Sequence, residues 1–170
     1  DSRGPIFHRQ SRIGLNGQVF TVLKFRTMVP NAEELGPAWT IADDPRVTRC
    51  GKILRRMAMD ELPELINIIR GEMSLVGPRA LDVAEHRDLE RTIAGFGDRL
   101  LVRPGLTGLA QVLDKRDDAK DKLKYDLEYI ARMSIWLDLR LLMVSVVNTF
   151  FGRWDRRMGK SEPPGGATKS

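Results

Sequence analysis

The sequence contains few of the residues that form disulfides or zinc sites. Its 170 residues include one cysteine, Cys50, and two histidines, His8 and His86. A single thiol cannot form an internal disulfide, and one thiol with two imidazoles cannot complete a Cys/His zinc site. A disulfide scaffold and a zinc finger are therefore excluded, and a reducing cytosolic setting is consistent with the composition. We predict that Cys50 is a small packed residue and His8 a surface residue, neither with a catalytic role.

The sequence also lacks long apolar runs and is poor in aromatic residues. No uncharged apolar run reaches the roughly 18 residues expected of a membrane-spanning helix. Phe, Trp and Tyr make up 6% of the residues and lie in apolar runs instead of alternating with basic residues. Because a surface that stacks nucleic-acid bases needs aromatic rings among basic groups, this distribution argues against nucleic acid as a partner.

The residues that are present are those of a basic globular domain. Hydrophobic residues make up 42% and charged residues 30% of the chain, which predicts a packed core. The 28 Lys and Arg exceed the 23 Asp and Glu, and the formal net charge of +5 suits phosphate-bearing ligands, anionic lipid or nucleic acid. We predict one domain over residues 1–152 and a polar, disordered tail over residues 153–170.

The residue pattern predicts an α+β fold, a small and mainly helical domain with a β-hairpin at its N-terminus. Two β-rich runs flank Asn16–Gly17, a dipeptide typical of hairpin turns, so we expect the hairpin over about residues 5–26. Residues 29–46 are rich in Pro, Gly, Asn and Asp. They are predicted to form a mobile loop with one helical turn near Ala32–Leu35.

Helical patterns follow that loop. The predicted helices begin at the N-cap Thr48, near Asp60, at residue 81 and near Lys120. The last of them is expected to run to Phe151, with a break near Ser134. Residues 74–79 and 103–108 are predicted to be a loop and a turn. Residues 139–151 are almost wholly apolar, which suits either a buried core helix or a helix lying at a lipid interface.

An adjacent pair of carboxylates is the first candidate for chemistry. Asp60 and Glu61 stand at a predicted helix N-terminus, shortly after the basic pair Arg55 and Arg56. A helix N-terminus lowers the cost of negative charge, and neighbouring arginines keep a carboxylate ionised and able to attack phosphorus or hold Mg²⁺. The alternative is that Asp60 is an N-cap and Glu61 a favourable charge in the first helical turn.

Other charged residues also allow two interpretations each. Arg79 follows Pro78 in a loop of small residues, where a rigid turn could aim its guanidinium at a diphosphate; otherwise it is a surface arginine. Lys24 and Arg26 would share one face of a strand, which suits phosphate binding or solvation at a strand edge. Asp138 interrupts an apolar helix, where a charge needs a partner such as a basic helix, so a structural and a catalytic role both stay open.

Several segments carry a stronger signal when they are taken in chain order. They are Lys24–Met28, Arg46–Gly51 with Leu54–Arg55, Asp60–Leu65 with Asn67, Gly71–Arg79, Arg103–Val112, and Tyr125–Asp126 with Trp136–Asp138. Over about residues 4–150 they resemble the bacterial sugar transferase family, the monotopic phosphoglycosyl transferases that prime glycan assembly on undecaprenyl phosphate. The resemblance, and not the spacing of the residues, favours a catalytic role for Asp60 and Glu61.

The resemblance implies a Mg²⁺-dependent covalent mechanism. Asp60 matches the nucleophile that attacks the β-phosphorus of a UDP-sugar, expels UMP and holds the phosphosugar as an acyl phosphate. Glu61, together with Asp60, matches the residues that bind Mg²⁺, and Arg79 matches the arginine that grips the nucleotide. Further matches to substrate-binding positions are Lys24, Arg55, Pro78 and Asp138.

The resemblance also implies the partners and the place of action. Polyprenyl phosphate would accept the phosphosugar, in the first membrane step of exopolysaccharide, O-antigen, capsule or glycoprotein assembly. The enzyme would work at the cytoplasmic face of the bacterial inner membrane, with amphipathic interfacial helices packing at the membrane surface. Family members carry a hydrophobic re-entrant helix just upstream of the point where this chain begins, and we expect that this segment is missing here. A homodimer is left open.

Two of the departures of the sequence from the family pattern bear on the site. Ala80 stands where a second proline is usual, which predicts a looser turn and a less fixed Arg79. Leu113–Arg116 replaces a common Gly-Arg pair, which bears on sugar or nucleotide specificity. Two other functions stay open: a catalytically silent scaffold of the same fold, against which the presence of Asp60 and Glu61 argues, and a basic module that binds anionic lipid or nucleic acid.

Overall fold

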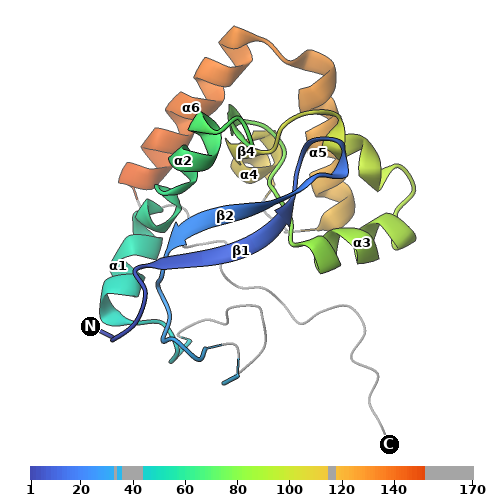
Figure 1. Ribbon diagram of the computed structural model, residues 1–170. Helices are drawn as coiled ribbons and strands as arrows, with labels where there is room; N and C mark the ends of the chain where they lie inside the picture. The colour runs from blue at the N-terminus through green and yellow to red at the C-terminus, as the bar shows by residue number, and fades with distance from the viewer. Residues whose placement is uncertain (33, 36–43, 115–117, 152–170) are drawn as a thin grey trace, which may run out of the picture.

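The computed structural model describes residues 1–32, 34–35, 44–114 and 118–151. These residues form a mixed fold of helices and strands that begins with an antiparallel hairpin, as the pattern predicts (Figure 1). Strands β1 (Phe7–Ile13) and β2 (Val19–Phe25) pair in register from Phe7↔Phe25 to Ile13↔Val19. Asn16 and Gly17 both have positive φ angles, 53° and 78°, in the short 3₁₀ turn η1 (Leu15–Gly17) between the strands. Asn-Gly favours this conformation in hairpins.

The first helix, α1 (Arg49–Arg56), begins where the sequence predicts. The Thr48 hydroxyl oxygen accepts a hydrogen bond from the Gly51 amide at 2.9 Å and so caps the helix. Gly51 is buried against the Thr27 carbonyl, and its neighbour Cys50 is exposed. The prediction that Cys50 is packed is therefore wrong, because Gly51 takes the position that faces the backbone of Thr27.

The helix predicted to begin near Asp60 is divided into two elements. A 3₁₀ turn, η2 (Met59–Glu61), comes first, and α2 (Glu64–Ile69) follows it. Ala58 has a left-handed conformation (φ 50°) that turns the chain before η2, and Pro63, which has no N–H, takes the N-cap position of α2. Gly71, with φ of 75°, follows the end of α2 as predicted.

Two short strands lie where a loop and a turn were predicted. β3 (Ser74–Val76) and β4 (Gly105–Thr107) pair in parallel, with Ser74 opposite Gly105 and Val76 opposite Thr107. Both predictions are wrong over these residues, because strands of this length are too short to show an alternating pattern. Their close approach depends on glycine, since a Cβ at position 105 would overlap the Gly77 amide nitrogen.

Apart from β4, the regular elements that follow β3 in the described residues are helical. They are α3 (Val83–Thr92), the 3₁₀ segment η3 (Phe96–Leu101), α4 (Leu109–Leu113), α5 (Ala119–Arg132) and α6 (Ile135–Phe150). The predicted break falls at Met133–Ser134, where the Ser134 hydroxyl oxygen accepts a hydrogen bond from the Leu137 amide at 3.3 Å. From this break α5 and α6 diverge (Figure 1).

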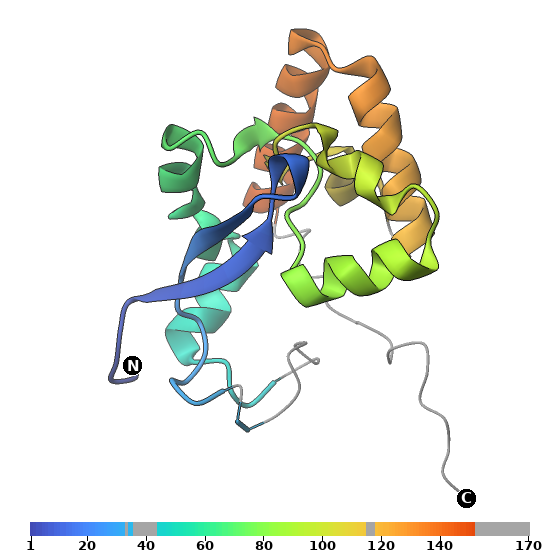
Figure 2. The ribbon, with the colours of Figure 1, turned by 45° about the vertical axis from the view of Figure 1, so that its right-hand side comes forward.

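The apolar core has two parts. One joins Val76 of β3, Tyr129 of α5 and Leu141 of α6, and the other joins Leu81, Phe96 and Leu123. The hairpin lies between α1 and α2 on one side and α3 on the other (Figures 1 and 2). This arrangement leaves the acidic turn η2 against β2, at the opposite side of the hairpin from α3.

Several apolar side chains face outward. On α2 the buried residues are Glu64 and Asn67, whereas Ile69 is 86% exposed. On α6, Leu141 is buried and Val146 is 54% exposed, so one face of the apolar stretch 139–151 packs into the core and another is exposed. Of the helices within the described residues, none combines the length and the apolar character that crossing a bilayer requires.

Three predictions fall partly or wholly outside the described residues. In the predicted mobile loop, Pro30–Ala32 and Glu34 lie in turns, and positions 33 and 36–43 are not among the residues described. The helical turn predicted near Ala32–Leu35 includes position 33. The predicted disordered tail, residues 153–170, also lies outside the described part of the chain.

Candidate active site

The carboxylate of Glu61 lies between two cations from distant parts of the chain. Its Oε1 atom accepts hydrogen bonds from Nζ of Lys24 on β2 and from Nη2 of Arg79, each at 2.7 Å. Nζ of Lys24 also lies 3.1 Å from Oε1 of Glu64 on α2. The side chain of Lys24 is 16% exposed, so solvation at a strand edge does not describe it. The structure thus brings three predicted site residues, Lys24, Glu61 and Arg79, into direct contact.

A buried amide holds α2 against the hairpin beside this contact. Asn67 is fully buried, and its Nδ2 donates to the carbonyl of Thr21 and to Oε2 of Glu72, each at 2.7 Å. Its Oδ1 accepts from the Leu23 amide at 3.2 Å. Because Leu23 precedes Lys24 and Asn67 lies one turn after Glu64, this amide fixes the distance between the lysine and the acidic residues.

Glu64 is a site residue that was not predicted from the sequence, and Asn67 was predicted only as part of a segment shared with the family. The available signal was their spacing, since positions 61, 64 and 67 recur every third residue and carry polar side chains. Residues three apart share one face of a helix. A polar stripe on an otherwise apolar segment indicates a helix face that contacts polar groups, and the structure buries Glu64 and Asn67 on the side of β2.

Asp60 is half-buried and adjacent to Glu61, and it does not cap a helix. The N-cap positions of η2 and α2 are Ala58 and Pro63, so the alternative that Asp60 is merely an N-cap is wrong. Burial raises the pKa of Asp60, and the charge of Glu61 raises it further, while Lys24 and Arg55 lower it in part. Asp60 is thus a carboxylate in a poorly solvated position close to several charges.

Glu61 and Arg79 hold one another in the charged form. Burial opposes a charge on Glu61, but Arg79 and Lys24 outweigh it and keep the pKa of Glu61 well below the usual range. Glu61 in turn raises the pKa of Arg79 against the effect of burial. The Arg79 side chain is 46% exposed, and its guanidinium has five N–H donors, more than the contact with Glu61 uses. It can therefore bind a ligand while it remains paired.

Arg55 approaches the site from α1. Its Nε donates to the hydroxyl of Thr27 at 2.8 Å. Burial lowers the pKa of Arg55 and the charge of Asp60 opposes that shift, so the guanidinium and the carboxylate influence one another. The structure places Arg55 where it stabilises a charge on Asp60.

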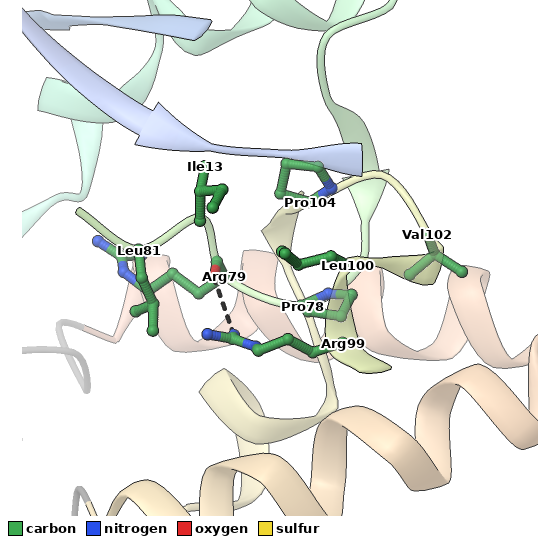
Figure 3. Close-up of a pocket in the computed structure, with 8 residues that line it drawn as sticks. All are labelled: Ile13, Pro78, Arg79, Leu81, Arg99, Leu100, Val102 and Pro104. Atoms are coloured by element: carbon green, nitrogen blue, oxygen red, sulfur yellow. Dashed lines mark hydrogen bonds between the residues drawn. The ribbon is translucent and has the colours of Figure 1, made fainter. Parts of the chain in front are cut away.

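Pro78 supports the loop that carries Arg79. It is buried, and its carbonyl accepts a hydrogen bond from the Gly105 amide of β4 at 2.9 Å. The neighbouring residues Arg79 and Leu81 line a small cavity with Ile13 and Arg99 (Figure 3). Figure 3 shows the Arg79 carbonyl directed at Arg99, while the Arg79 side chain extends away from it.

Two residues singled out from the sequence have their observed partners elsewhere. Arg26 donates to the carbonyls of Ser2, Arg3 and Pro5, and so fastens the N-terminal segment. Oδ1 of Asp138 accepts a hydrogen bond from the Tyr129 hydroxyl at 2.9 Å, and burial together with Asp138 raises the pKa of Tyr129. Within the described residues no ion pair joins Asp138 to a basic helix, and no hydrogen bond joins it to the acidic pair.

The residues that could hold a metal ion are Asp60 and Glu61. Among the described residues, no group of three or more His, Cys, Asp or Glu side chains is arranged to hold an ion. Mg²⁺ is often held by one or two carboxylates together with waters and the phosphate oxygens of a substrate. The acidic pair fits a site shared with a phosphate ligand, and it does not fit a site made by protein ligands alone.

Comparison with known proteins identifies the group to which this chain is related. The model of the bacterial sugar transferase family matches residues 1–152. The chain is 42% identical over 167 residues to an undecaprenyl-phosphate glucose phosphotransferase of Komagataeibacter xylinus, with 90% of this chain and 31% of the relative covered. It is 37% identical over 158 residues to the UDP-glucose:undecaprenyl-phosphate glucose-1-phosphate transferase of Escherichia coli K12, with 89% and 34% covered.

A third relative is the UDP-glucose:undecaprenyl-phosphate glucose-1-phosphate transferase of Caulobacter vibrioides, 42% identical over 154 residues, with 86% of this chain and 57% of the relative covered. The chain thus spans about a third of the length of the first two relatives and somewhat more than half of the third. The match of the family model extends over all of the elements described above. This chain belongs to the bacterial sugar transferase family.

Proposed function

We propose that this chain transfers a sugar-1-phosphate from a UDP-sugar to polyprenyl phosphate, with UMP and polyprenyl diphosphate-sugar as products. The observation that carries the proposal is the charged, doubly hydrogen-bonded Glu61 beside the half-buried Asp60. The names of the relatives support it, because they describe the transfer of glucose phosphate to undecaprenyl phosphate. The sugar of the donor is not part of the proposal.

In the first step a carboxylate oxygen of Asp60 attacks the β-phosphorus of the donor. The bond between that phosphorus and the bridging oxygen breaks, and UMP leaves with the bridging oxygen and its electron pair. The phosphosugar stays on Asp60 as an acyl phosphate. The partial burial of Asp60 favours a role as nucleophile, because a poorly solvated carboxylate is more reactive. Arg55 and Lys24 favour the ionised form of Asp60.

In the second step an oxygen of the polyprenyl phosphate attacks the same phosphorus. The bond from phosphorus to Asp60 breaks, and the carboxylate is regenerated without net proton transfer. A water-soluble donor and a lipid acceptor can therefore use one site in turn.

Arg79 and Lys24 are proposed to bind the donor diphosphate. Both side chains are hydrogen-bonded to Glu61, so their cationic groups are in place before the donor binds. Little rearrangement of these side chains is then needed. A guanidinium also matches the two-pronged geometry of a phosphate group. Mg²⁺, held by Asp60, Glu61 and the donor, would neutralise charge on the diphosphate and the leaving group.

The place of action is proposed to be the cytoplasmic face of the bacterial inner membrane. The outward-facing apolar residues of α2 and the net positive charge of the chain support contact with an anionic lipid surface. The reaction would then be the first membrane step in building a bacterial glycan.

A catalytically silent scaffold of the same fold is the alternative. In such a protein Asp60 would react with nothing, and Glu61 with its two cations would serve only to hold η2 against β2. The two possibilities differ in whether UMP is released from the donor.

UMP release in the absence of lipid acceptor tests the proposal. The chain is mixed with Mg²⁺ and with UDP-glucose or UDP-N-acetylgalactosamine, the donors in the names of two relatives. We expect a rapid burst that approaches a single UMP per chain, and no burst from Asp60→Asn. The matched control is Asp98→Asn, which alters an exposed aspartate of η3 and should leave the burst unchanged. Release of UMP only after acceptor is added would overturn the covalent mechanism.

A further inference from the structure

The loop that carries Arg79 is held by its backbone carbonyls. Four consecutive carbonyl oxygens accept hydrogen bonds from groups outside the loop. The donors to residues 78, 79, 80 and 81 are the Gly105 amide (2.9 Å), Nη2 of Arg99 (2.9 Å), Nη1 of Arg12 (3.2 Å) and the Ile13 amide (3.1 Å). Two of these donors are guanidinium groups.

These contacts fix the backbone from which the Arg79 side chain projects. The carbonyl of Pro78 belongs to the peptide plane that precedes the Arg79 Cα, and the carbonyl of Arg79 belongs to the plane that follows it. Because each peptide unit is rigid, fixing both planes fixes φ and ψ of Arg79 and hence the direction of its Cα–Cβ bond. Gly105 holds the first plane and Arg99 holds the second.

Arg99 is itself held in a buried charge pair. Its Nη2 lies 2.7 Å from Oδ2 of Asp126 on α5, and the two side chains are only 4% and 2% exposed. The guanidinium also lies over the Phe96 ring, 5.1 Å from its centre. A buried ion pair is weak evidence for added stability, because apolar residues of similar size often serve as well. The direction in which the pair holds Arg99, toward the Arg79 carbonyl, offers a second role (Figure 3).

Arg12, on β1, holds the next carbonyl of the loop. Its guanidinium donates to Ala80 and to Oε1 of Gln10, the latter at 2.6 Å. Ala80 is the position at which the family usually has proline, and a looser turn is the consequence expected from sequence. The structure shows instead that the carbonyls on both sides of that position are held from outside.

We propose that Arg99, oriented by Asp126, and Arg12 are positioning residues that hold the loop of residues 78–81 so that the Arg79 guanidinium meets the donor diphosphate. The inference rests on the proposed function, in which Arg79 binds the nucleotide. Neither Arg99 nor Arg12 is proposed to touch the donor. Both act through Arg79.

A double-mutant cycle with UMP and Mg²⁺ as the probe, followed by calorimetry, tests this proposal on the full chain. The first change is the paired variant Arg99→Met/Asp126→Leu, which removes both buried charges together and so avoids leaving one without a partner. We expect UMP affinity to fall about tenfold in this variant, since the charge-assisted contact of a misdirected Arg79 is weakened. In the background of Arg79→Ala the same pair of changes should have no further effect on affinity.

Leu141→Ala is the matched control for a purely structural effect. Leu141 is buried on α6 in the other core cluster, with Val76 and Tyr129, and that cluster includes none of residues 78–81. It should lower the unfolding midpoint and leave UMP affinity within about twofold of wild type. If the paired variant does not fold, the same double-mutant cycle is measured with Arg12→Met. This change removes the hydrogen-bond donor to the Ala80 carbonyl, and Arg12 is only half-buried.

The outcomes separate this inference from the proposed function. Weaker binding in the paired variant that disappears in the Arg79→Ala background supports the inference. Loss of affinity that is the same in both backgrounds overturns it and leaves the role of Arg79 intact. If Arg79→Ala alone binds UMP as well as wild type does, the proposed role of Arg79 fails and the inference fails with it.

Discussion

Glu61 accepts two cationic donors on one carboxylate oxygen, while Asp60 beside it is half-buried and has a raised pKa. Lys24 and Arg79 hold the pKa of Glu61 well below its usual range against the effect of burial. Neighbouring carboxylates whose environments push their pKa values apart commonly divide the chemistry of an active site between them. We therefore interpret Asp60 as the reactive carboxylate and Glu61 as the binding one.

Replacing Lys24 with Met should destabilise the protein in a manner that depends on pH. Lys24 contacts Glu64, whose side chain is 7% exposed and whose pKa is raised by burial even with the lysine present. Without that cation the pKa of Glu64 rises further. A carboxyl whose pKa is raised in the folded state favours folding at low pH, so the loss of stability grows as pH rises through that pKa.

We expect the free energy of unfolding of Lys24→Met to fall by about 3 kcal/mol at about pH 8 and by less near pH 5, where the loss of the contact with Glu61 remains, as measured by urea denaturation. The control is Lys52→Met, because Lys52 is exposed on α1 and its loss should change stability by less than about 0.5 kcal/mol. An equal deficit at both pH values would show that Glu64 does not titrate as described.

Individual site residues could be predicted from the sequence only in part. Asp60, Glu61 and Arg79 stand out through a resemblance between motifs, and their spacing alone leaves a capping role and a surface role open. The contact between Lys24 and Glu61 joins residues 37 apart. It depends on how the hairpin meets η2, so no local pattern reveals it.

Close approach between backbones determines how the elements of the site meet. α1 passes the end of β2 at Gly51, where a Cβ would lie 2.8 Å from the Thr27 carbonyl carbon and would overlap its oxygen. Arg55 on the same helix donates to the Thr27 hydroxyl at 2.8 Å. The glycine therefore sets the distance at which Arg55 approaches Asp60.

Gly51→Ala should push α1 away from Thr27. We expect an unfolding free energy about 3 kcal/mol lower than that of wild type, as found when a packed position is overfilled. UMP release should also slow, because Arg55 moves away from Asp60. Cys50→Ala on the same helix is the control, since Cys50 is exposed, and both variants are compared by urea denaturation and by the UMP burst. Wild-type stability in Gly51→Ala would mean that this approach is not tight.

Elements with a strong local pattern agree with prediction, and elements set by tertiary contacts do not. The hairpin turn, the Thr48 cap and the break at Ser134 each depend on one or two residues with a marked local preference. β3 and β4 exist because segments about 30 residues apart pair with one another. Neither segment is long enough to indicate a strand by itself.

At the scale of the whole molecule, α2 and α6 carry apolar side chains that are exposed on the surface. α2 is inverted relative to an ordinary surface helix, because it buries Glu64 and Asn67 and exposes isoleucine and leucine side chains. The helical spacing of those apolar residues predicts that they face the core. They face outward instead, because α2 packs its polar side chains against polar groups of the hairpin. The expectation that such helices pack at a membrane surface stays a prediction.

Ile69→Asp should weaken binding to lipid without disturbing the fold. Ile69 is 86% exposed, so its replacement removes few contacts within the protein. We expect the partition coefficient onto phosphatidylglycerol-containing vesicles, measured by flotation, to fall about tenfold or more, as the loss of one inserted isoleucine and the added charge imply. The control Leu101→Asp makes the same kind of change on η3, where the side chain is also exposed. Equal binding by all three proteins would exclude α2 as the lipid contact.

The central claim is that Asp60 carries the phosphosugar during the reaction. The most direct measurement is the intact mass of the chain after incubation with Mg²⁺ and UDP-sugar in the absence of lipid acceptor. Wild type should gain the mass of one phosphosugar, peptide mapping should locate it on Asp60, and Asp60→Asn should gain nothing. An adduct of the same mass on Asp60→Asn would contradict the account.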